Sequence, residues 1–254
     1  MSGFLTLPSR GTKPRDVGIT HVIDKGIGIR QLKDLLETSS GHIDIIKFGW
    51  GTAYLTMNTL GKIRACHEAK VPVCFGGTFL ELALLQGKFD EYRNMMHRAK
   101  MTHVEISTRV VNFSRQEKAQ YIRELAKEFT VLSKVGSKDA EKIVPPYLWV
   151  KQIESDLEAG AWKVVCHGGE SGIVGLYFGT GEVRSGLVEE IIEKINQADL
   201  IFEAPLKTQQ VLLVNKFGTE VNVGNVYPED VIALETFRLG LHASTMSQFH
   251  NVAG

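Results

Sequence analysis

Short apolar runs alternate with longer segments of mixed polarity along the chain, and this alternation predicts its secondary structure. The apolar runs are rich in Val and Ile and lack a strict polar alternation. Such runs are typical of strands that are buried on both faces. The predicted strands span residues 19–24, 43–48, 72–75, 103–107, 131–135, 163–167, 200–203 and 220–223.

The longer segments between these runs predict helices. They span residues 29–37, 58–69, 78–86 with 91–100, 115–128, 148–158, 187–196, 209–217 and 228–239. The last begins with clear signals, because Pro228 suits a first helical turn and Glu229 and Asp230 complement the positive end of the helix dipole. Gly160 follows the helix over 148–158 and can close it in a left-handed conformation.

A strand followed by a helix, eight times in succession, predicts the fold. The repeat implies parallel strands with right-handed crossovers. The chain has 254 residues, and a (β/α)8 barrel typically needs about 250. We therefore predict an α/β protein with a single (β/α)8 TIM barrel over residues 1–254 and a barrel core over about 17–245. An open doubly wound sheet is the rival, although no GxGxxG motif follows the first strand.

The composition excludes several classes of protein. Lys plus Arg number 29, as do Asp plus Glu, so no global field attracts nucleic acid or a membrane surface. No apolar run approaches the roughly 18 residues of a membrane span, and residues 1–15 lack the apolar centre of a signal peptide. The three cysteines form no CxxC pair, which argues against a disulfide framework or a zinc site. We expect a cytoplasmic protein.

Polar residues gather where the predicted strands end, which is where barrels of this kind carry their chemistry. They include Asp24, Lys25, Lys47, Glu105, Ser107, Arg109, Lys134, Ser137, Lys138, His167, Glu170, Ser171, Glu203, Lys207, Asn222 and Asn225, with the glycine pairs Gly76-Gly77 and Gly168-Gly169. Each has a structural alternative. Lys47 could pair with a carboxylate to hold the barrel, Asp24 could cap a helix, and the glycines could form tight turns.

Taken together, these residues indicate a binding site for a small anion. Several cations on one rim suit a substrate with several negative groups, and glycine-rich loops expose N–H groups that can hold phosphate oxygens. Carboxylates among the cations indicate Mg²⁺ held by one or two carboxylates and a substrate phosphate. The residues alone thus predict an enzyme acting on a small phosphorylated or multiply anionic carboxylate.

The strings at the strand ends resemble those of the phosphosulfolactate synthase family, from about Pro14 to about Thr245. The strings are Lys13-Pro14-Arg15, Val22-Ile23-Asp24-Lys25-Gly26, Asp44-Ile45-Ile46-Lys47-Phe48-Gly49-Trp50-Gly51-Thr52, Phe75-Gly76-Gly77-Thr78, Val104-Glu105-Ile106-Ser107, Val135-Gly136-Ser137-Lys138, Asp156-Leu157-Glu158-Ala159-Gly160-Ala161, Glu170-Ser171-Gly172, Gly181-Glu182-Val183-Arg184, Ile201-Phe202-Glu203-Ala204-Pro205 and Val221-Asn222-Val223-Gly224-Asn225. The resemblance implies a (β/α)8 barrel and a homo-oligomer. It also implies Mg²⁺-assisted addition of sulfite to phosphoenolpyruvate, giving (2R)-phospho-3-sulfolactate in the first step of coenzyme M biosynthesis.

The implied chemistry suggests a role for each rim residue. We expect Lys138 to be the general acid, Lys47 to bind the enolate or carboxylate, and His167 to be a third catalytic residue. Candidate ligands of Mg²⁺ are Asp24, Glu105 and Glu203. Candidate substrate-binding residues are Lys25, Gly76, Gly77, Arg109, Lys134, Ser137, Gly168, Gly169, Ser171 and Asn225.

The chain departs from the family pattern at the rim. The family usually has Glu at the position of Lys134, Glu-Ala-Arg in place of His167-Gly168-Gly169, and Asp or Asn then Gly in place of Thr108-Arg109. Arg109 can replace the guanidinium that is lost at Gly169. Two alternatives stay open. One is a divergent lyase that adds another nucleophile to an enol or unsaturated acid without a strict need for Mg²⁺, and the other is a non-catalytic stress-related or ligand-binding barrel.

Overall fold

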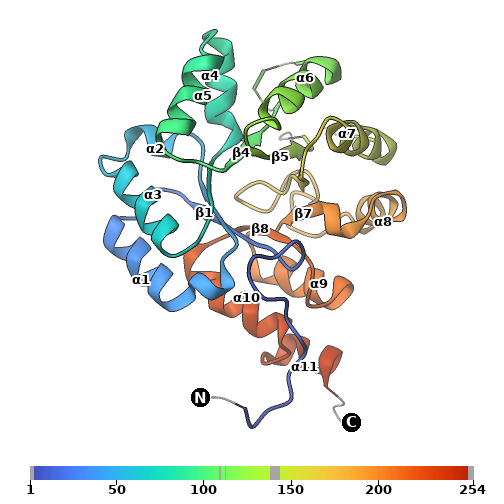
Figure 1. Cartoon of the computed structure of the whole chain (residues 1–254). Coiled ribbons are helices and arrows are strands. Elements are labelled where there is room, and N and C mark those ends of the chain that lie inside the picture. The colour runs from blue at the N-terminus through green and yellow to red at the C-terminus, as the bar shows by residue number, and fades with distance from the viewer. Residues whose placement is uncertain (1–2, 109, 112, 138–143, 251–254) are drawn as a thin grey trace.

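Eight parallel strands form one sheet that curls into a nearly closed barrel, with helices around its outside (Figure 1). The computed structural model describes residues 3–108, 110–111, 113–137 and 144–250. The strands are β1 (Thr20–Asp24), β2 (Ile45–Phe48), β3 (Val73–Phe75), β4 (His103–Ile106), β5 (Thr130–Val135), β6 (Lys163–Cys166), β7 (Leu200–Glu203) and β8 (Val223–Val226). The prediction of a (β/α)8 barrel is confirmed.

The α-helices lie outside the sheet, as the crossovers require. They are α1 (Ile29–Ser39), α2 (Thr52–Leu55), α3 (Thr59–Glu68), α4 (Gly77–Leu85), α5 (Phe89–Arg98), α6 (Arg115–Leu125), α7 (Pro146–Glu158), α8 (Ser185–Lys194), α9 (Lys207–Phe217), α10 (Val231–Arg238) and α11 (Ala243–Phe249). Short 3₁₀ turns, η1 (Ser40–His42), η2 (Gln197–Asp199) and η3 (Pro228–Asp230), connect some of them. The short helices α2 and α11 were not predicted.

The strand order is β3-β2-β1-β8-β7-β6-β5-β4, so the first and last strands of the chain, β1 and β8, lie side by side in the sheet. Neighbouring strands in this order are paired in parallel. β3 and β4 approach each other across the remaining gap, but within the described residues no backbone ladder joins them.

The predicted bounds of the eighth strand were wrong, because β8 begins where the prediction over 220–223 ends. The cause is an irregular stretch opposite β1, where Thr20 pairs with Val223 but Val22 pairs with Val226. Asn225 lies in this stretch with a left-handed φ of 54°, which Asn tolerates better than most residues.

Alternating residues along each strand face the inside and the outside of the barrel. An apolar layer fills the inside, formed by Ile19, Ile45, Cys74, Leu132, Val165 and Ile201. Four polar residues each lie two positions after a residue of this layer, so their side chains face the same way. They are Lys47, Lys134, His167 and Glu203. The polar site therefore begins directly above an apolar layer at the carboxyl ends of the strands.

The N-terminal segment before β1 lies across the opposite end of the barrel. Residues 13–16 line a cavity of about 470 Å³ there with the beginnings of several strands. Arg15 Nη1 binds Asp44 Oδ1 at 3.0 Å, and Arg10 Nε binds Glu235 Oε1 at 2.9 Å. These ion pairs attach the segment to the barrel.

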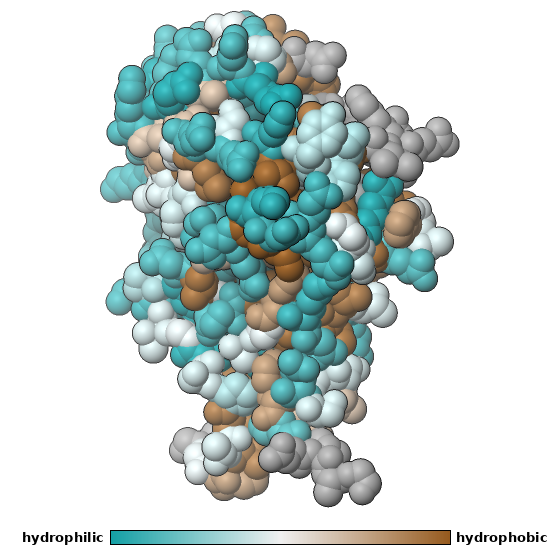
Figure 2. All heavy atoms as spheres, turned by 90° about the vertical axis from the view of Figure 1, so that its right-hand side faces the viewer, coloured by the Kyte–Doolittle hydropathy of each residue, from teal (hydrophilic) through white to brown (hydrophobic). Residues whose placement is uncertain are grey.

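The side of the barrel that carries α7 and α8 is largely hydrophilic, with apolar side chains showing between the polar ones (Figure 2). Such a mixture is ordinary for a folded chain, because isolated apolar side chains are common on protein surfaces. No helix in the described part of the chain is long and apolar enough to cross a bilayer.

Candidate active site

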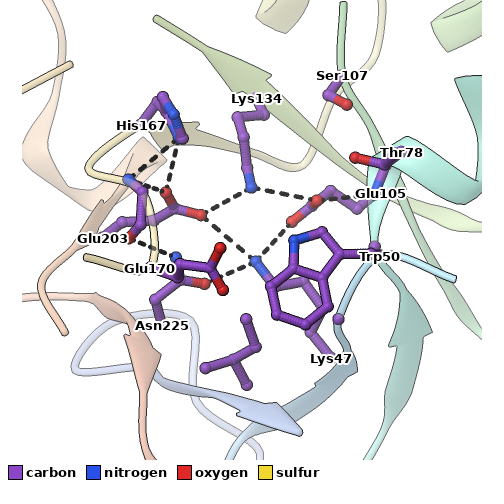
Figure 3. Close-up of a pocket in the computed structure, with 15 residues that line it drawn as sticks. Lys47, Trp50, Thr78, Glu105, Ser107, Lys134, His167, Glu170, Glu203 and Asn225 are labelled. Atoms are coloured by element: carbon purple, nitrogen blue, oxygen red, sulfur yellow. Dashed lines mark hydrogen bonds and ion pairs between the residues drawn. The ribbon is translucent and has the colours of Figure 1, made fainter. Parts of the chain in front are cut away.

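A small cavity lies at the carboxyl ends of the strands, with charged side chains at its floor (Figure 3). Its volume is about 40 Å³, which is room for a few water molecules. It is lined by Ile23, Lys47, Gly49, Trp50, Gly76, Gly77, Thr78, Glu105, Ser107, Lys134, His167, Gly169, Glu170, Glu203 and Asn225. All eight strands, or the loops that follow them, contribute these residues, and β5 does so through Lys134.

Two lysines and two glutamates form a ring of alternating charge at the floor of this cavity (Figure 3). Lys47 Nζ lies 3.2 Å from Glu105 Oε2 and 3.4 Å from Glu203 Oε1. Lys134 Nζ lies 3.3 Å from Glu105 Oε1 and 2.7 Å from Glu203 Oε1. All four side chains are buried. We call these four residues the charge ring.

Neighbouring groups hold both glutamates of the charge ring in position. Glu203 Oε2 lies 2.9 Å from His167 Nδ1 and accepts the backbone N–H groups of Gly168 and Gly169 at 3.0 and 3.1 Å. On the other side, Glu105 Oε1 accepts the N–H of Gly77 at 2.8 Å. These N–H groups point at a carboxylate of the protein itself, so they stabilise the ring directly.

Asn225 connects the charge ring to the loop after β6. Its Oδ1 accepts a hydrogen bond from Lys47 Nζ at 2.7 Å, and its Nδ2 donates to Gly169 O at 2.9 Å. The unusual backbone of β8 thus brings an amide to a place where it can orient both a lysine and a glycine loop.

Both glutamates of the charge ring are ionised at neutral pH. Burial by itself raises the pKa of Glu105, but the ammonium groups of Lys134 and Lys47 outweigh it and hold this pKa at about 2. Burial also opposes ionisation of Glu203, yet the same two lysines and the hydrogen bond with His167 lower its pKa well below the ordinary value. The two ammonium groups balance these two negative charges.

His21 lies in the barrel interior next to the charge ring. It is fully buried on β1, and a side chain at Gly224 of β8 would come within 3.2 Å of its Nδ1. Burial, and then the positive charge of Lys47, lower the pKa of His21 to about 3. This histidine is therefore neutral at physiological pH and adds no charge beneath the ring.

The structure does not bring Asp24 to the other two predicted metal ligands. In the register of β1 and β2, Ile23 lies beside Lys47 and Asp24 lies beside Phe48, which packs in the apolar core. Asp24 therefore faces the helices, where its Oδ2 forms an ion pair with Lys62 of α3. Its Oδ1 accepts the N–H groups of Gly26 and Ile27 at 2.7 and 2.9 Å.

The described carboxylates do not fit a joint three-carboxylate magnesium site. The oxygens of Glu105 and Glu203 are already in contact with lysines and N–H groups, and Asp24 is bound to Lys62. Among the described residues, no group of three or more His, Cys, Asp or Glu side chains is arranged to hold a metal ion.

The other predicted substrate-binding residues take different places. Gly76, like Gly77 and Gly169, lines the cavity, and the N–H of Gly168 binds Glu203. Lys25 is exposed, with Nζ 4.1 Å from the centre of the Tyr227 ring, a cation–π distance. Ser171 is exposed and Ser137 is half-buried beyond β5. Arg109 and Lys138 lie outside the described residues.

Several residues at the cavity were given no catalytic, substrate-binding or metal-binding role from the sequence. Trp50, Thr78 and Glu170 all line it, and Figure 3 shows Trp50 and Glu170 beside Lys47 and Asn225. Trp50 has a left-handed φ of 47°, which is rare for a bulky residue. Its position between Gly49 and Gly51 directly after a strand was the available signal, because an aromatic residue there must extend over the barrel mouth.

Fold and site together define the class of protein: a (β/α)8-barrel enzyme with its charged site at the carboxyl ends of the strands. Residues 8–244 match the family model of (2R)-phospho-3-sulfolactate synthase (ComA). The chain belongs to this phosphosulfolactate synthase family, as its resemblance at the strand ends predicted.

Curated relatives support this membership along nearly the whole chain. A phosphosulfolactate synthase of Bacillus subtilis is 41% identical over 244 residues, covering 95% of this chain and 97% of the relative. One from Methanothermobacter thermautotrophicus is 39% identical over 251 residues, covering 96% and 97%. One from Methanocaldococcus jannaschii is 37% identical over 238 residues, covering 91% and 94%.

Solved structures that are similar in shape show the barrel fold alone. The 3-hexulose-6-phosphate synthase of Salmonella typhimurium matches with a TM-score of 0.55 at 13% identity, covering 90% of this chain and 93% of that one. The 3-keto-L-gulonate-6-phosphate decarboxylase of Vibrio cholerae matches with a TM-score of 0.54 at 8% identity, covering 91% and 97%.

Proposed function

We propose that this chain is a lyase that forms a carbon–sulfur bond by adding sulfite to phosphoenolpyruvate, giving (2R)-phospho-3-sulfolactate. The observation that carries the proposal is the charge ring, which holds the ammonium groups of Lys47 and Lys134 together at the barrel mouth. Three relatives named phosphosulfolactate synthase support the choice of reaction.

The reaction places negative charge where these lysines lie. The lone pair of the sulfite sulfur attacks the terminal carbon of phosphoenolpyruvate, and the electrons of the carbon–carbon double bond move onto the carboxylate as an enolate. The adjacent carbon then takes up a proton, and no bond to phosphorus is broken. Two ammonium groups at the carboxylate favour the transition state, because they stabilise the charge where it develops.

Substrate binding requires the lysines to turn away from the glutamates. The cavity has room for only a few water molecules, and both lysines are engaged within the charge ring. The carboxylate of the substrate would replace part of these ion pairs, with Lys47 and Lys134 moving toward it. Glu105 and Glu203 would keep both lysines near their positions throughout.

The source of the proton stays a prediction. Lys138, the expected general acid, lies outside the described residues. His167 lies at the cavity, where Glu203 orients its ring through Nδ1. If the variant Lys138→Ala keeps full turnover, Lys138 takes no part in the mechanism.

The decisive test is an assay with phosphoenolpyruvate and sulfite in which the product is identified by mass. We expect one product whose mass is the sum of both substrates and no release of inorganic phosphate. Lys47→Met should abolish turnover, whereas Lys194→Met, the same change on the exposed face of α8, should leave turnover unchanged. Consumption of phosphoenolpyruvate without a sulfur-containing product would contradict the proposal.

The same assay and two other measurements test the remaining predictions from the sequence. Parallel reactions with Mg²⁺ and with a chelator measure the need for a metal, and replacing sulfite with other nucleophiles tests the divergent lyase. The non-catalytic alternative expects no turnover with any nucleophile. Light scattering of the purified protein tests the predicted homo-oligomer, and fractionation of cells tests the predicted cytoplasmic location.

A further inference from the structure

Glu81 is a buried carboxylate beside the site that the proposed reaction does not use. It lies on α4, with 1% of its surface exposed. One of its oxygens accepts the hydroxyl hydrogen of Ser107. The other accepts the backbone N–H groups of Val110 and Val111 at 2.6 and 3.0 Å. Glu81 thus ties α4 to the segment that follows β4.

This segment forms part of the cavity wall. Ser107 lines the cavity two residues after Glu105 of the charge ring. A side chain at Gly77 would come within 2.9 Å of the Ser107 backbone nitrogen, so the start of α4 lies directly against Ser107. Since the N–H of Gly77 also binds Glu105 at 2.8 Å, α4 supports both the charge ring and the wall beside it.

The chemistry of these contacts suits a carboxylate at position 81. A carboxylate accepts from all three donors without bringing a donor of its own, whereas Met at this position would offer them no oxygen. Val110 is 60% exposed, so in the absence of Glu81 its N–H would bind water. The buried carboxylate of Glu81 therefore holds the backbone N–H groups of Val110 and Val111.

We propose that Glu81 is a positioning residue for the proposed function, on which this inference rests. It fixes residues 107, 110 and 111 so that Ser107 stays at the cavity wall beside Glu105. The cavity wall then keeps its shape when Lys47 and Lys134 turn toward the substrate. Glu81 itself does not touch the substrate.

The test is the variant Glu81→Met, which removes both acceptor oxygens from a side chain of similar length, with Glu91→Met on the exposed face of α5 as the matched control. A displacement of about 1 Å at an active site can lower the rate by roughly 100-fold. In Glu81→Met, kcat/KM for phosphoenolpyruvate should therefore fall by roughly 100-fold, and KM should rise. Hydrogen exchange at Val110 and Val111 should speed up by about ten- to a hundredfold, the value of a hydrogen bond to a charged group. The control variant should change neither quantity.

Exchange separates this inference from the proposed function, because it needs no turnover. Wild-type exchange rates at Val110 and Val111 in Glu81→Met would overturn the anchoring role, and so would a loss of activity that only follows the unfolded fraction. If Glu81→Met does not fold, Ser107→Ala removes one donor and leaves the contacts of Glu81 with Val110 and Val111. That variant should lose about tenfold in kcat/KM, the order of a single hydrogen bond, and wild-type kinetics in it would also overturn the proposal.

Discussion

Lys134→Met removes one charge from the ring while keeping a side chain of similar length. The variant loses the contacts of the ammonium group with Glu105 at 3.3 Å and with Glu203 at 2.7 Å. Two buried carboxylates then share the ammonium group of Lys47, and the ring carries a net negative charge. Removing one partner of a buried ion pair costs about 3–5 kcal/mol, a large part of the roughly 5–15 kcal/mol that stabilises a folded domain.

A second substitution tests whether this loss reflects charge balance. Lys134→Met combined with Glu105→Gln leaves one ammonium group and one carboxylate, Lys47 and Glu203. The oxygen of the new amide can still accept the N–H of Gly77. We expect the double variant to be more stable than Lys134→Met by about 1–3 kcal/mol, a normal coupling energy between residues in contact. Both variants should be inactive, because both lack an ammonium group that the substrate needs.

The difference between Lys134→Met and the wild type should also depend on pH. In the wild type, Glu105 has a pKa of about 2, so it adds stability above its unfolded value near 4.5 and loses this stability as pH falls toward 2. Without Lys134, the pKa of Glu105 rises, and protonation relieves the buried charge. The stability of the two proteins should therefore converge as pH is lowered from 7.

Urea unfolding followed by circular dichroism measures all three effects, and Lys194→Met on the surface of α8 is the control. The reasoning is refuted if Lys134→Met loses less than about 1 kcal/mol, well below the range for a broken buried pair. It is equally refuted if the double variant is less stable than the single one.

Three further predictions concern groups around the charge ring. Folding lowers the pKa of His21 to about 3, so below pH 6.5 this histidine is protonated in the unfolded chain but neutral in the folded one. The folded protein should therefore lose up to about 1.4 kcal/mol of stability per pH unit. Urea unfolding of His21→Leu should show a smaller dependence on pH. In Gly168→Ala the new Cβ would lie 2.5 Å from the backbone oxygen of Glu203, so we expect a loss of about 1–3 kcal/mol in thermal unfolding, together with reduced turnover. Lys62→Met should destabilise the protein by about 3–5 kcal/mol, because it leaves the buried carboxylate of Asp24 without its ion pair. If Mg²⁺ fully restored the melting temperature of this variant, the result would instead indicate that Asp24 binds metal.

Periodicity predicted the barrel, because strand and helix patterns depend on local spacing that the chain carries within each segment. The rim position of Lys47, Glu105, Lys134, His167 and Glu203 was predictable for the same reason. Each of these residues ends a predicted strand or lies one or two positions before its end, and the carboxyl ends of parallel strands meet at one mouth. The departure from the family at Lys134 was also visible in the sequence.

Only the tertiary structure decided which of the polar residues meet. Asp24 ends its strand just as Glu203 ends its own, but the register of β1 and β2 turns Asp24 toward Lys62 and the helices. Because these strands are apolar on both faces, no polar alternation along the chain reveals which way a residue points. Glu81 was hidden for a related reason, since its partners lie some thirty residues further on, at 107, 110 and 111. Such contacts depend on how a helix docks against a neighbouring strand, and that packing is set by the whole barrel rather than by any local segment.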